Sequence, residues 1–386
     1  MIKKSNKIRV LHVIDSLACG GAERMLITKL SHLNKEKFYN AVLYLYSDSY
    51  FLHEIKDLNI NVYPADLKNA YHPLAALRSI SNVIKKERID IVHTNLFNAD
   101  IYGRIGGKLS HVECIITTLH NLAYESAASF RNEFLFKKRR ILDSLTGRLF
   151  NKAFIAVSDA VKKFAEWSLG FKNVNLIYNS IDLNILRPLL PGEKKDMREV
   201  LGLKQDTIVI VTTGRMDTQK GHAFLLEALN DPRIKGRDIT LLLLGSGCLE
   251  GRLKDIAKAL GIRDKVIFLG YRREIREILG CADIFVLPTV SEGFGLSLLE
   301  AMALGVPCIA SDTGGIKEII AHNDNGLLCE PSSSLGLAEA INMLIDDPVK
   351  RKRFSQNSFV KIAACFNIEK NISLLEKLYL DTVTKR

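Results

Sequence analysis

The chain has 386 residues, and at about 100–200 residues per domain this length indicates two domains or at most three. Hydrophobic residues make up 47% of the chain and charged residues 25%, which excludes disorder, collagen and repeats of biased composition. The net charge of +11 is uneven, because residues 1–183 carry 26 basic and 17 acidic side chains and the remainder carries 28 and 26. An anionic surface or substrate is therefore expected to meet the N-terminal half.

Short apolar runs alternate with longer helical patterns along the whole chain, which predicts an α/β fold with parallel sheets built from βαβ units. The first run, Ile8–Ile14, contains Arg9 and His12 and ends at Asp15, so it indicates a buried strand and not a signal peptide. The other strands expected in the first half cover residues 40–46, 89–93, 114–118, 153–157 and 174–178.

A glycine turn follows the first predicted strand. Gly20 and Gly21 lie where a helix is expected to begin, and the unpaired N–H groups at a helix N-terminus can bind an anion. The turn lacks the Gly-x-Gly-x-x-Gly spacing, so it does not indicate dinucleotide binding. A tight turn without a ligand would have the same sequence.

His120 follows the strand predicted at residues 114–118. Side chains at the carboxyl ends of parallel strands border the ligand site in doubly wound sheets, so His120 is a candidate site residue. A satisfied structural histidine is the other interpretation, and it is the one we expect for His12 and His93, which lie within predicted strands.

Residues 126–172 hold ten basic and four acidic side chains. Lys137, Lys138, Arg139 and Arg140 lie there among bulky apolar residues on a helical pattern, which suits the interface of an anionic bilayer. A core helix with a solvated basic face would give the same pattern. Nucleic-acid binding is not expected, because no track of stacking aromatics accompanies the basic residues.

A polar segment with two prolines, Arg187–Lys195, interrupts the alternation and predicts a linker. Strands are expected again at residues 207–213, 239–244, 266–269, 284–287 and 306–310. We therefore predict two facing doubly wound, Rossmann-like domains with an interdomain cleft. The predicted boundaries are residues 1–183 for the N-terminal domain, 184–205 for the linker, 206–365 for the C-terminal domain and 366–386 for a terminal helix.

Three loops of the second domain place glycines at the ends of predicted strands, and two of these loops also carry cations. The loop Gly214–Gly221 carries Arg215 and Lys220, which could neutralise phosphate oxygens, although a basic surface loop would look the same. The next two strands end in the segments Leu244–Gly247 and Leu269–Arg273. The candidate ligand-binding residues in these two segments are Gly245, Tyr271, Arg272 and Arg273.

The segment Ser291–Ala303 contains more candidate ligand-binding residues than any other segment of the sequence. Gly293 and Gly295 fall in a strand-to-helix turn, which can receive a diphosphate at a helix N-terminus. If the span from Glu292 to Glu300 were wholly helical, the two residues would lie about 12 Å apart. A retaining pair of acid and nucleophile needs about 5–5.5 Å, so these glutamates are expected to hold separate parts of one long ligand. A solvated helix with two helix-favouring glutamates is the alternative.

Together these motifs resemble the retaining glycosyltransferases of family 4, which have the two-domain GT-B fold. The resemblance covers nearly the whole chain. It rests on the turn Gly20-Gly21-Ala22-Glu23, the loop Gly214–Gly221, Gly270, the Glu292–Glu300 motif, Gly314-Gly315-Ile316-Lys317-Glu318 and Asn325-Gly326-Leu327.

The resemblance implies a role for each candidate residue. Arg215 and Lys220 would hold the donor diphosphate, and Glu300 the ribose hydroxyls. His120 and Glu292 would be the catalytic residues beside the transferred sugar. The remaining donor-binding residues would be Gly20 and Gly21 near the diphosphate, Gly245, the base contacts Tyr271, Arg272 and Arg273, and the backbone of Gly293, Phe294, Gly295 and Leu296. Residues 1–183 would form the acceptor-binding domain and residues 206–365 the nucleotide-sugar-binding domain. The terminal helix would cross back to the first domain.

The function expected from this resemblance is transfer of a hexose or N-acetylhexosamine from a nucleotide sugar, with UDP as the nucleotide, to a lipid-linked or cell-surface polysaccharide acceptor. No Asp-x-Asp pair occurs, so no metal and no other cofactor is expected. The scattered cysteines predict a cytoplasmic protein, and the lack of a long apolar stretch predicts no membrane span. The basic segment at residues 126–172 adds the alternative of a peripheral location on the inner face of the cytoplasmic membrane. The alternatives are a sugar-nucleotide epimerase on the same fold and a non-catalytic nucleotide-sugar sensor.

Overall fold

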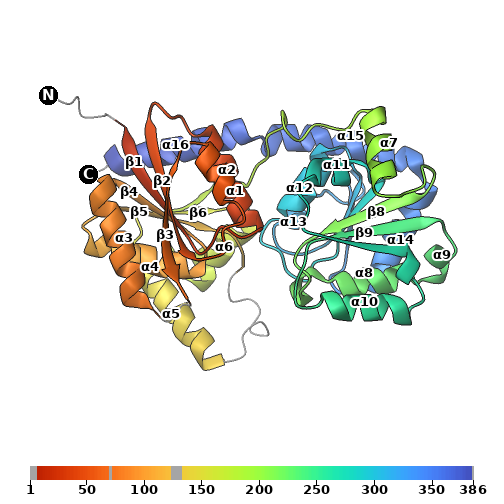
Figure 1. Ribbon diagram of the computed structural model, residues 1–386, viewed down its shortest axis with the longest axis horizontal. Coiled ribbons are helices and arrows are strands. Elements are labelled where there is room, and N and C mark those ends of the chain that lie inside the picture. Colours follow the sequence, from red (N-terminus) through yellow and green to blue (C-terminus); the bar gives the residue numbers. More distant parts are fainter. Residues whose placement is uncertain (1–6, 69–71, 123–132, 385–386) are drawn as a thin grey trace. The chain divides into compact units, whose positions relative to one another are not determined.

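The structure is a computed structural model that describes residues 7–68, 72–122 and 133–384. The chain divides into two compact units, the first formed by residues 1–179 and 368–386 and the second by Ser180–Asn367. Each unit contains one sheet whose strands all run parallel, with helices on both faces (Figure 1). The predicted pair of doubly wound α/β domains is therefore confirmed.

The sheet of the first unit has the order β3-β2-β1-β4-β5-β6-β7. Its strands are β1 (Ile8–Ile14), β2 (Phe38–Tyr46), β3 (Asn61–Leu67), β4 (Ile91–Asn95), β5 (Cys114–Leu119), β6 (Ala153–Ala156) and β7 (Val174–Leu176). The chain runs outward from β1 in one direction and then outward from β4 in the other, so the order reverses between these two strands. Ligands of such sheets bind beyond the carboxyl ends at this reversal.

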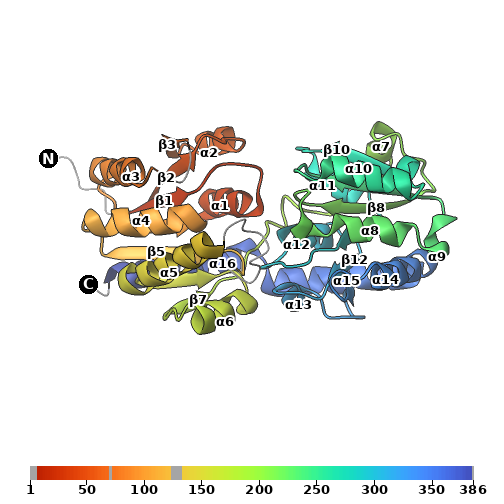
Figure 2. The same cartoon turned by 90° about the horizontal axis from the view of Figure 1, so that it is seen from below.

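Helices cover both faces of this sheet. They are α1 (Gly21–His32), α2 (Leu52–Asp57), α3 (Pro73–Glu87), α4 (Phe97–Leu109), α5 (Glu133–Phe150), α6 (Asp159–Ser168) and the terminal α16 (Ile368–Thr384). Helices α3, α4 and α5 lie side by side along one face (Figure 2). Within the described ranges, no helix is both long and apolar enough to cross a membrane.

Helix α16 completes the opposite face of the first sheet, although it is the last element of the chain. Ile372, Leu375 and Tyr379 are buried in the core that β1, β2, β4 and α1 form. The Tyr379 hydroxyl lies 2.5 Å from His93 Nδ1, and the other ring nitrogen of His93 lies 2.7 Å from the Thr118 hydroxyl. His93 is therefore a satisfied structural residue, as its position in the predicted strand indicated.

Replacing Tyr379 by Phe is expected to lower the free energy of unfolding of the first unit by about 1–3 kcal/mol, because a buried ring nitrogen of His93 loses its partner. Urea unfolding measures this change. A Ser373→Ala variant is a matched control on the same helix, since its exposed hydroxyl bonds only the Glu369 carbonyl. Equal stabilities of the two variants would contradict the structural role of this bond.

The second unit repeats the doubly wound design with the strand order β10-β9-β8-β11-β12-β13, and here the order reverses between β8 and β11. The strands are β8 (Ile208–Thr213), β9 (Ile239–Leu244), β10 (Val266–Gly270), β11 (Ile284–Leu287), β12 (Cys308–Ser311) and β13 (Leu327–Cys329). The helices are α7 (Pro191–Val200), α8 (His222–Leu229), α9 (Pro232–Lys235), α10 (Glu250–Ala259), α11 (Ile275–Gly280), α12 (Leu296–Ala303), α13 (Ile316–Ile319), α14 (Ser334–Asp346) and α15 (Pro348–Cys365).

Residues 184–205, which the sequence predicts to be a linker, contain helix α7 and belong to the second unit. Arg198 of α7 is buried, and its guanidinium lies 2.7 Å from an Asp283 carboxylate oxygen at the start of β11. A second Asp283 contact, to Lys194, is 3.0 Å long. These pairs fix α7 to the second sheet.

Candidate active site

The loops that follow β8 and β11 meet at the carboxyl edge of the second sheet, where the strand order reverses. The first is Gly214–Gly221, and the second runs from Pro288 to Gly295. Gln219 joins them through three hydrogen bonds. Its carbonyl accepts from the Val290 N–H at 2.8 Å and from the Thr289 hydroxyl at 2.9 Å, and its side-chain amide donates to the Ser291 carbonyl at 3.0 Å. The expected convergence of these two loops is thus present.

Glycine is required where these loops pack backbone against backbone. A Cβ on Gly221, whose φ is +65°, would lie 2.0 Å from the Pro288 carbonyl oxygen. A Cβ on Gly245, with φ +120°, would lie 2.1 Å from the Gly214 carbonyl oxygen. Gly245 therefore positions the loop after β8, in addition to the donor-binding role that the resemblance implies.

Lys220 and Glu292 form an ion pair across the two loops. The Lys220 Nζ lies 2.5 Å from Glu292 Oε2, and both side chains are mostly enclosed, with 18% and 17% of their surface exposed. Lys220 ends a 3-10 turn, η2 (Thr218–Lys220), which begins at Asp217; the Asp217 carboxylate accepts the Lys220 N–H at 3.2 Å. One cation and one carboxylate are therefore held together at the strand-order reversal.

Arg215 lies in the same loop as Lys220 but makes a different contact. Its guanidinium lies 3.2 Å from an Asp217 carboxylate oxygen, and 63% of its side chain is exposed. An exposed arginine can reorient toward an anion with little structural cost, whereas Lys220 is already held in place.

Helix α12 begins directly after Gly295, which has φ +98°. Its first turn offers backbone N–H groups to an anion, as the sequence indicated. The Phe294 side chain is buried and packs edge-on against Phe366, with 5.6 Å between the ring centroids. Only the backbone of Phe294 is therefore available to a ligand. Glu300 lies further along α12 and is partly buried.

The base-contact candidates follow β10, two strands away from the reversal. Tyr271, Arg272 and Arg273 come directly after Gly270 and are exposed. They share the carboxyl edge of the sheet with the Lys220–Glu292 pair because all strands run parallel.

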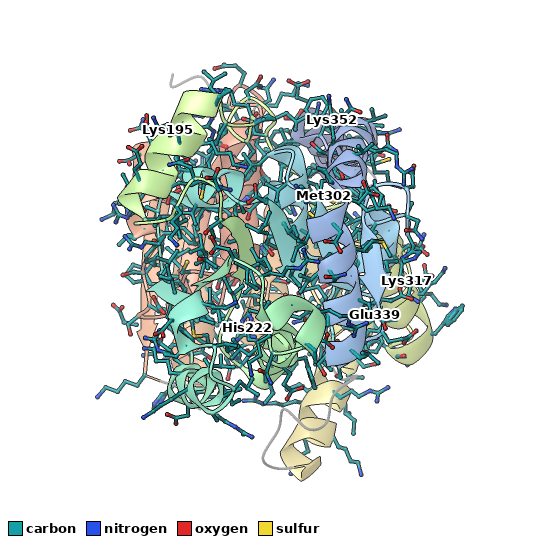
Figure 3. The ribbon with its side chains drawn as sticks, turned by 90° about the vertical axis from the view of Figure 1, so that its right-hand side faces the viewer. Lys195, His222, Met302, Lys317, Glu339 and Lys352 are labelled. Atoms are coloured by element: carbon teal, nitrogen blue, oxygen red, sulfur yellow. The ribbon has the colours of Figure 1, made fainter. Side chains whose placement is uncertain are left out.

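His222 is a buried neighbour of the site that sequence reasoning did not select. It is the first residue of α8 (Figure 3), and its ring lies against the backbone of Gly214 and Arg215. Burial, and after it the charge of Lys220, lowers the pKa of His222 to about 4. The ring is therefore neutral at physiological pH and supports the loop without adding charge.

His120 lies at the carboxyl end of β5, next to the strand-order reversal of the first sheet. Its Nε2 lies 3.1 Å from Oδ1 of Asn95, the last residue of β4. Burial, and after it the charge of Lys29, lowers the pKa of His120 to about 3. Because Oδ1 of an amide only accepts, Nε2 carries the proton and Nδ1 keeps a lone pair.

Asn95 is a second residue that the sequence analysis missed. Its Nδ2 is buried and has no hydrogen-bond partner among the described residues. The next residue, Leu96, has φ +72°, an uncommon conformation for a branched side chain. A ligand that accepts a hydrogen bond would satisfy the amide. The available signal was the place of Asn95 at the end of a central strand.

The glycine turn after β1 lies next to Glu23 in the first turn of α1. A Cβ on Gly20 would lie 2.3 Å from an oxygen of the buried Glu23 carboxylate, which folds back on the start of α1. Gly21 is exposed at the first position of the helix. This Cβ would displace only the end of the flexible Glu23 side chain, and the φ of Gly20 is −136°, so packing alone does not require a glycine at position 20. A ligand contact of either glycine stays a prediction.

The four cations predicted to meet a membrane lie on α5, but they do not form one uniform group. Lys137 and Lys138 are exposed. The Arg139 guanidinium lies over the Phe97 ring at 5.5 Å from its centroid, and Arg140 donates a hydrogen bond to the Ser168 carbonyl at 3.2 Å. The two lysines are therefore the more outward part of this cluster.

Comparison with known proteins gives a consistent result over most of the chain. Residues 19–185 match the family model "Glycosyltransferase Family 4", and residues 193–360 match "Glycosyl transferases group 1". An Escherichia coli UDP-Gal:alpha-D-GlcNAc-diphosphoundecaprenol alpha-1,3-galactosyltransferase is 28% identical over 99% of both chains. A Bacillus anthracis N-acetyl-alpha-D-glucosaminyl L-malate synthase is 27% identical over 88% of this chain and 86% of its own.

Solved structures agree on the fold. Anabaena HepE in complex with UDP and glucose superimposes with a TM-score of 0.85 at 22% identity, covering 97% of this chain and all of that one. WaaG, a glycosyltransferase involved in lipopolysaccharide biosynthesis, gives a TM-score of 0.76 at 16% identity, with 96% and 98% covered. The expected GT-B fold is confirmed. The chain belongs to the family 4 glycosyltransferases.

Proposed function

We propose that this glycosyltransferase moves a hexose or N-acetylhexosamine from a UDP sugar to a hydroxyl of a lipid-linked or cell-surface polysaccharide acceptor, with retention of anomeric configuration. The observation that carries the proposal is the Lys220–Glu292 pair at the reversal of the second sheet, beside the start of α12. The Escherichia coli relative, which matches end to end, supports the donor and acceptor class by its name.

Lys220, Arg215 and the first turn of α12 are assigned to bind the donor diphosphate. As the bond between the sugar C1 and the phosphate oxygen breaks, that oxygen gains negative charge, which the Lys220 ammonium stabilises in an enclosed site. We propose that no metal is required, since these groups supply the positive charge. Glu292 keeps one oxygen on Lys220 and can accept sugar hydroxyls with the other.

The anomeric configuration is retained if the acceptor replaces the diphosphate on the same face of the sugar, and we assign this course to the reaction. The acceptor oxygen forms the new bond to C1 on the face from which the diphosphate leaves, and the acceptor proton passes to the departing phosphate oxygen. UDP leaves with the electron pair of the broken bond, so atoms and charges balance without a protein nucleophile. His120, neutral and with a lone pair on Nδ1, is assigned to accept a hydrogen bond from a substrate hydroxyl.

An Asn95→Asp variant tests the role assigned to His120. Wild-type His120, with a pKa of about 3, stays neutral between pH 5 and 8, so its titration contributes no loss of activity there. A carboxylate beside Nε2 favours the imidazolium and raises the pKa of His120, and protonation removes the lone pair on Nδ1. An opposite charge raises a pKa by about 1–3 units, so we expect kcat/KM of the variant, relative to wild type, to fall by up to about tenfold from pH 8 to pH 5.

Asn40→Asp is the matched control for this experiment. Asn40 Oδ1 lies 3.0 Å from Nε2 of His12, a histidine buried in the middle of the same sheet. We expect the control to alter stability but to leave the shape of the pH–rate profile unchanged. Parallel profiles of all three proteins would remove His120 from the mechanism.

A donor screen tests the function as a whole. The purified protein is incubated with a panel of nucleotide sugars and a metal chelator, and released nucleoside diphosphate is followed with and without membrane lipid extract. Release that requires the extract supports the transferase. Epimerised donor without extract would favour the epimerase, and binding without conversion would favour the sensor.

A further inference from the structure

Helix α5 presents a row of apolar side chains to solvent. Ile141 and Leu149 are 66% and 64% exposed, and Leu142 and Leu145 are about half exposed. The spacing of these residues places them on one side of the helix, three or four positions apart along its length. Large apolar side chains are normally scattered on a surface, so a contiguous row indicates an interaction site.

The exposure is not a sign of a loosely placed helix, because the opposite side of α5 is firmly held. The fully buried Arg104 of α4 donates hydrogen bonds to the side chains of Asp143 at 2.5 Å and Thr146 at 3.3 Å. Gly147 packs so closely on the Phe171 ring that a Cβ would clash with it. The row from Ile141 to Leu149 is thus fixed facing outward.

The end of helix α6 extends this surface. Arg148 of α5 donates two hydrogen bonds to the Leu169 carbonyl, at 2.9 and 2.8 Å, and Arg140 bonds the Ser168 carbonyl. Between the helices lies a shallow hollow of about 290 Å³. Its lining residues are Arg140, Ile141, Ser144, Leu145, Arg148 and Ser168.

Trp167 of α6 directly precedes Ser168, which lines this hollow. It is the single tryptophan of the chain, and 82% of its surface is exposed. Tryptophan is enriched where one side of a surface meets lipid and the other meets water, because its ring is apolar and its N–H is a donor. Sequence reasoning did not select this residue. We call the exposed residues of α5 together with Trp167 and Ser168 the α5–α6 surface.

We propose that the α5–α6 surface docks on an anionic lipid bilayer, with the apolar row and Trp167 in the interface and the cations of α5 at the lipid headgroups. Lys137, Lys138, Arg140 and Arg148 flank the apolar residues, and residues 126–172 carry ten basic against four acidic side chains. This charge favours an anionic partner. Such docking would bring the enzyme to its proposed lipid-linked acceptor, and only this benefit rests on the proposed function.

Intrinsic fluorescence provides a direct test, because Trp167 is the only tryptophan and lies on the surface in question. Full-length protein is titrated with vesicles of phosphatidylcholine and phosphatidylglycerol, without donor or acceptor. We expect a shift of the emission maximum to shorter wavelength, and quenching by brominated lipid, with anionic vesicles and weak signals with phosphatidylcholine alone. High salt is expected to weaken binding.

Two variants separate the apolar and the charged contributions. Ile141→Ser with Leu145→Ser and Leu149→Ser removes the apolar row, and Lys137→Ser with Lys138→Ser removes two outward cations. We expect each to weaken vesicle binding at least tenfold. The matched control is Val349→Ser with Val360→Ser, which removes two exposed apolar side chains from α15 in the second unit and should not change binding.

Several results would overturn the proposal. The first is wild-type-like vesicle binding of both variants, and the second is an unchanged Trp167 emission with anionic vesicles. The third is a blue shift without lipid that grows with protein concentration, because it would identify a second copy of the chain as the partner of this surface. Vesicle binding is measured without turnover. Its failure is therefore distinguishable from a failure of the proposed transferase activity.

Discussion

Replacing Lys220 by Ala is expected to lower kcat/KM for sugar transfer by about 100- to 1000-fold. The Lys220 ammonium is held against Glu292 at the strand-order reversal, where it is assigned to stabilise the departing diphosphate. Its charge matters most when the phosphate oxygen gains charge, so we expect the loss mainly in kcat. Steady-state kinetics with the preferred UDP sugar and lipid acceptor measure the effect.

The matched control for this variant is Lys254→Ala. Lys254 also pairs with a glutamate, Glu250, at 2.6 Å, but the pair lies on the surface of α10 in the same unit. We expect the control to retain full activity and both variants to keep the fold. A Lys220→Ala variant with activity within threefold of wild type would contradict the assigned role.

Replacing Arg104 by Met is expected to destabilise the first unit by about 3–5 kcal/mol, because it leaves the Asp143 carboxylate buried without its partner. Arg104 is fully buried, and its Nη1 lies 2.5 Å from Asp143 Oδ1. The same guanidinium bonds the Thr117 hydroxyl of β5 through Nε at 3.1 Å. The residue therefore joins α4, α5 and the sheet.

Amide hydrogen exchange in β4 and β5 measures this loss within the first unit. An Arg104→Met, Asp143→Leu double variant should recover part of the stability, because no buried charge of the pair is left alone. Arg237→Met is the control: its partner Asp346 is 2.8 Å away, but both side chains are nearly half exposed, so we expect a change below about 1 kcal/mol. A similar small change for Arg104→Met would contradict the account.

Most of the fold could be predicted because parallel strands buried on both faces give continuous apolar runs. Two strands were missed for physical reasons. Strand β3 (Asn61–Leu67) lies at the sheet edge, contains Pro64 and buries only Leu67, so its apolar signal is weak. Strand β13 (Leu327–Cys329) has three residues, which is too short for a pattern.

Only part of the candidate site could be predicted from the sequence. Glycine turns that carry charged residues at strand ends could be predicted, and the structure brings Lys220 and Glu292 together although 72 positions separate them. Asn95 was missed because its role depends on a contact with His120. The structural Arg104 was missed because it depends on contacts with Asp143, Thr146 and Thr117, which lie elsewhere in the chain. Trp167 was missed because exposure of a helix face depends on how its other side is packed.

The central claim is transfer of a sugar from a UDP donor to a lipid-linked acceptor. The most direct measurement incubates the protein with radiolabelled UDP-hexose, a metal chelator and membrane lipid extract, and then follows the label into the organic phase. We predict lipid-bound label that requires the extract, is lost in the Lys220→Ala variant and has the anomeric configuration of the donor. Label that stays in the aqueous phase for every UDP sugar tested, or an inverted linkage in the product, would contradict the account.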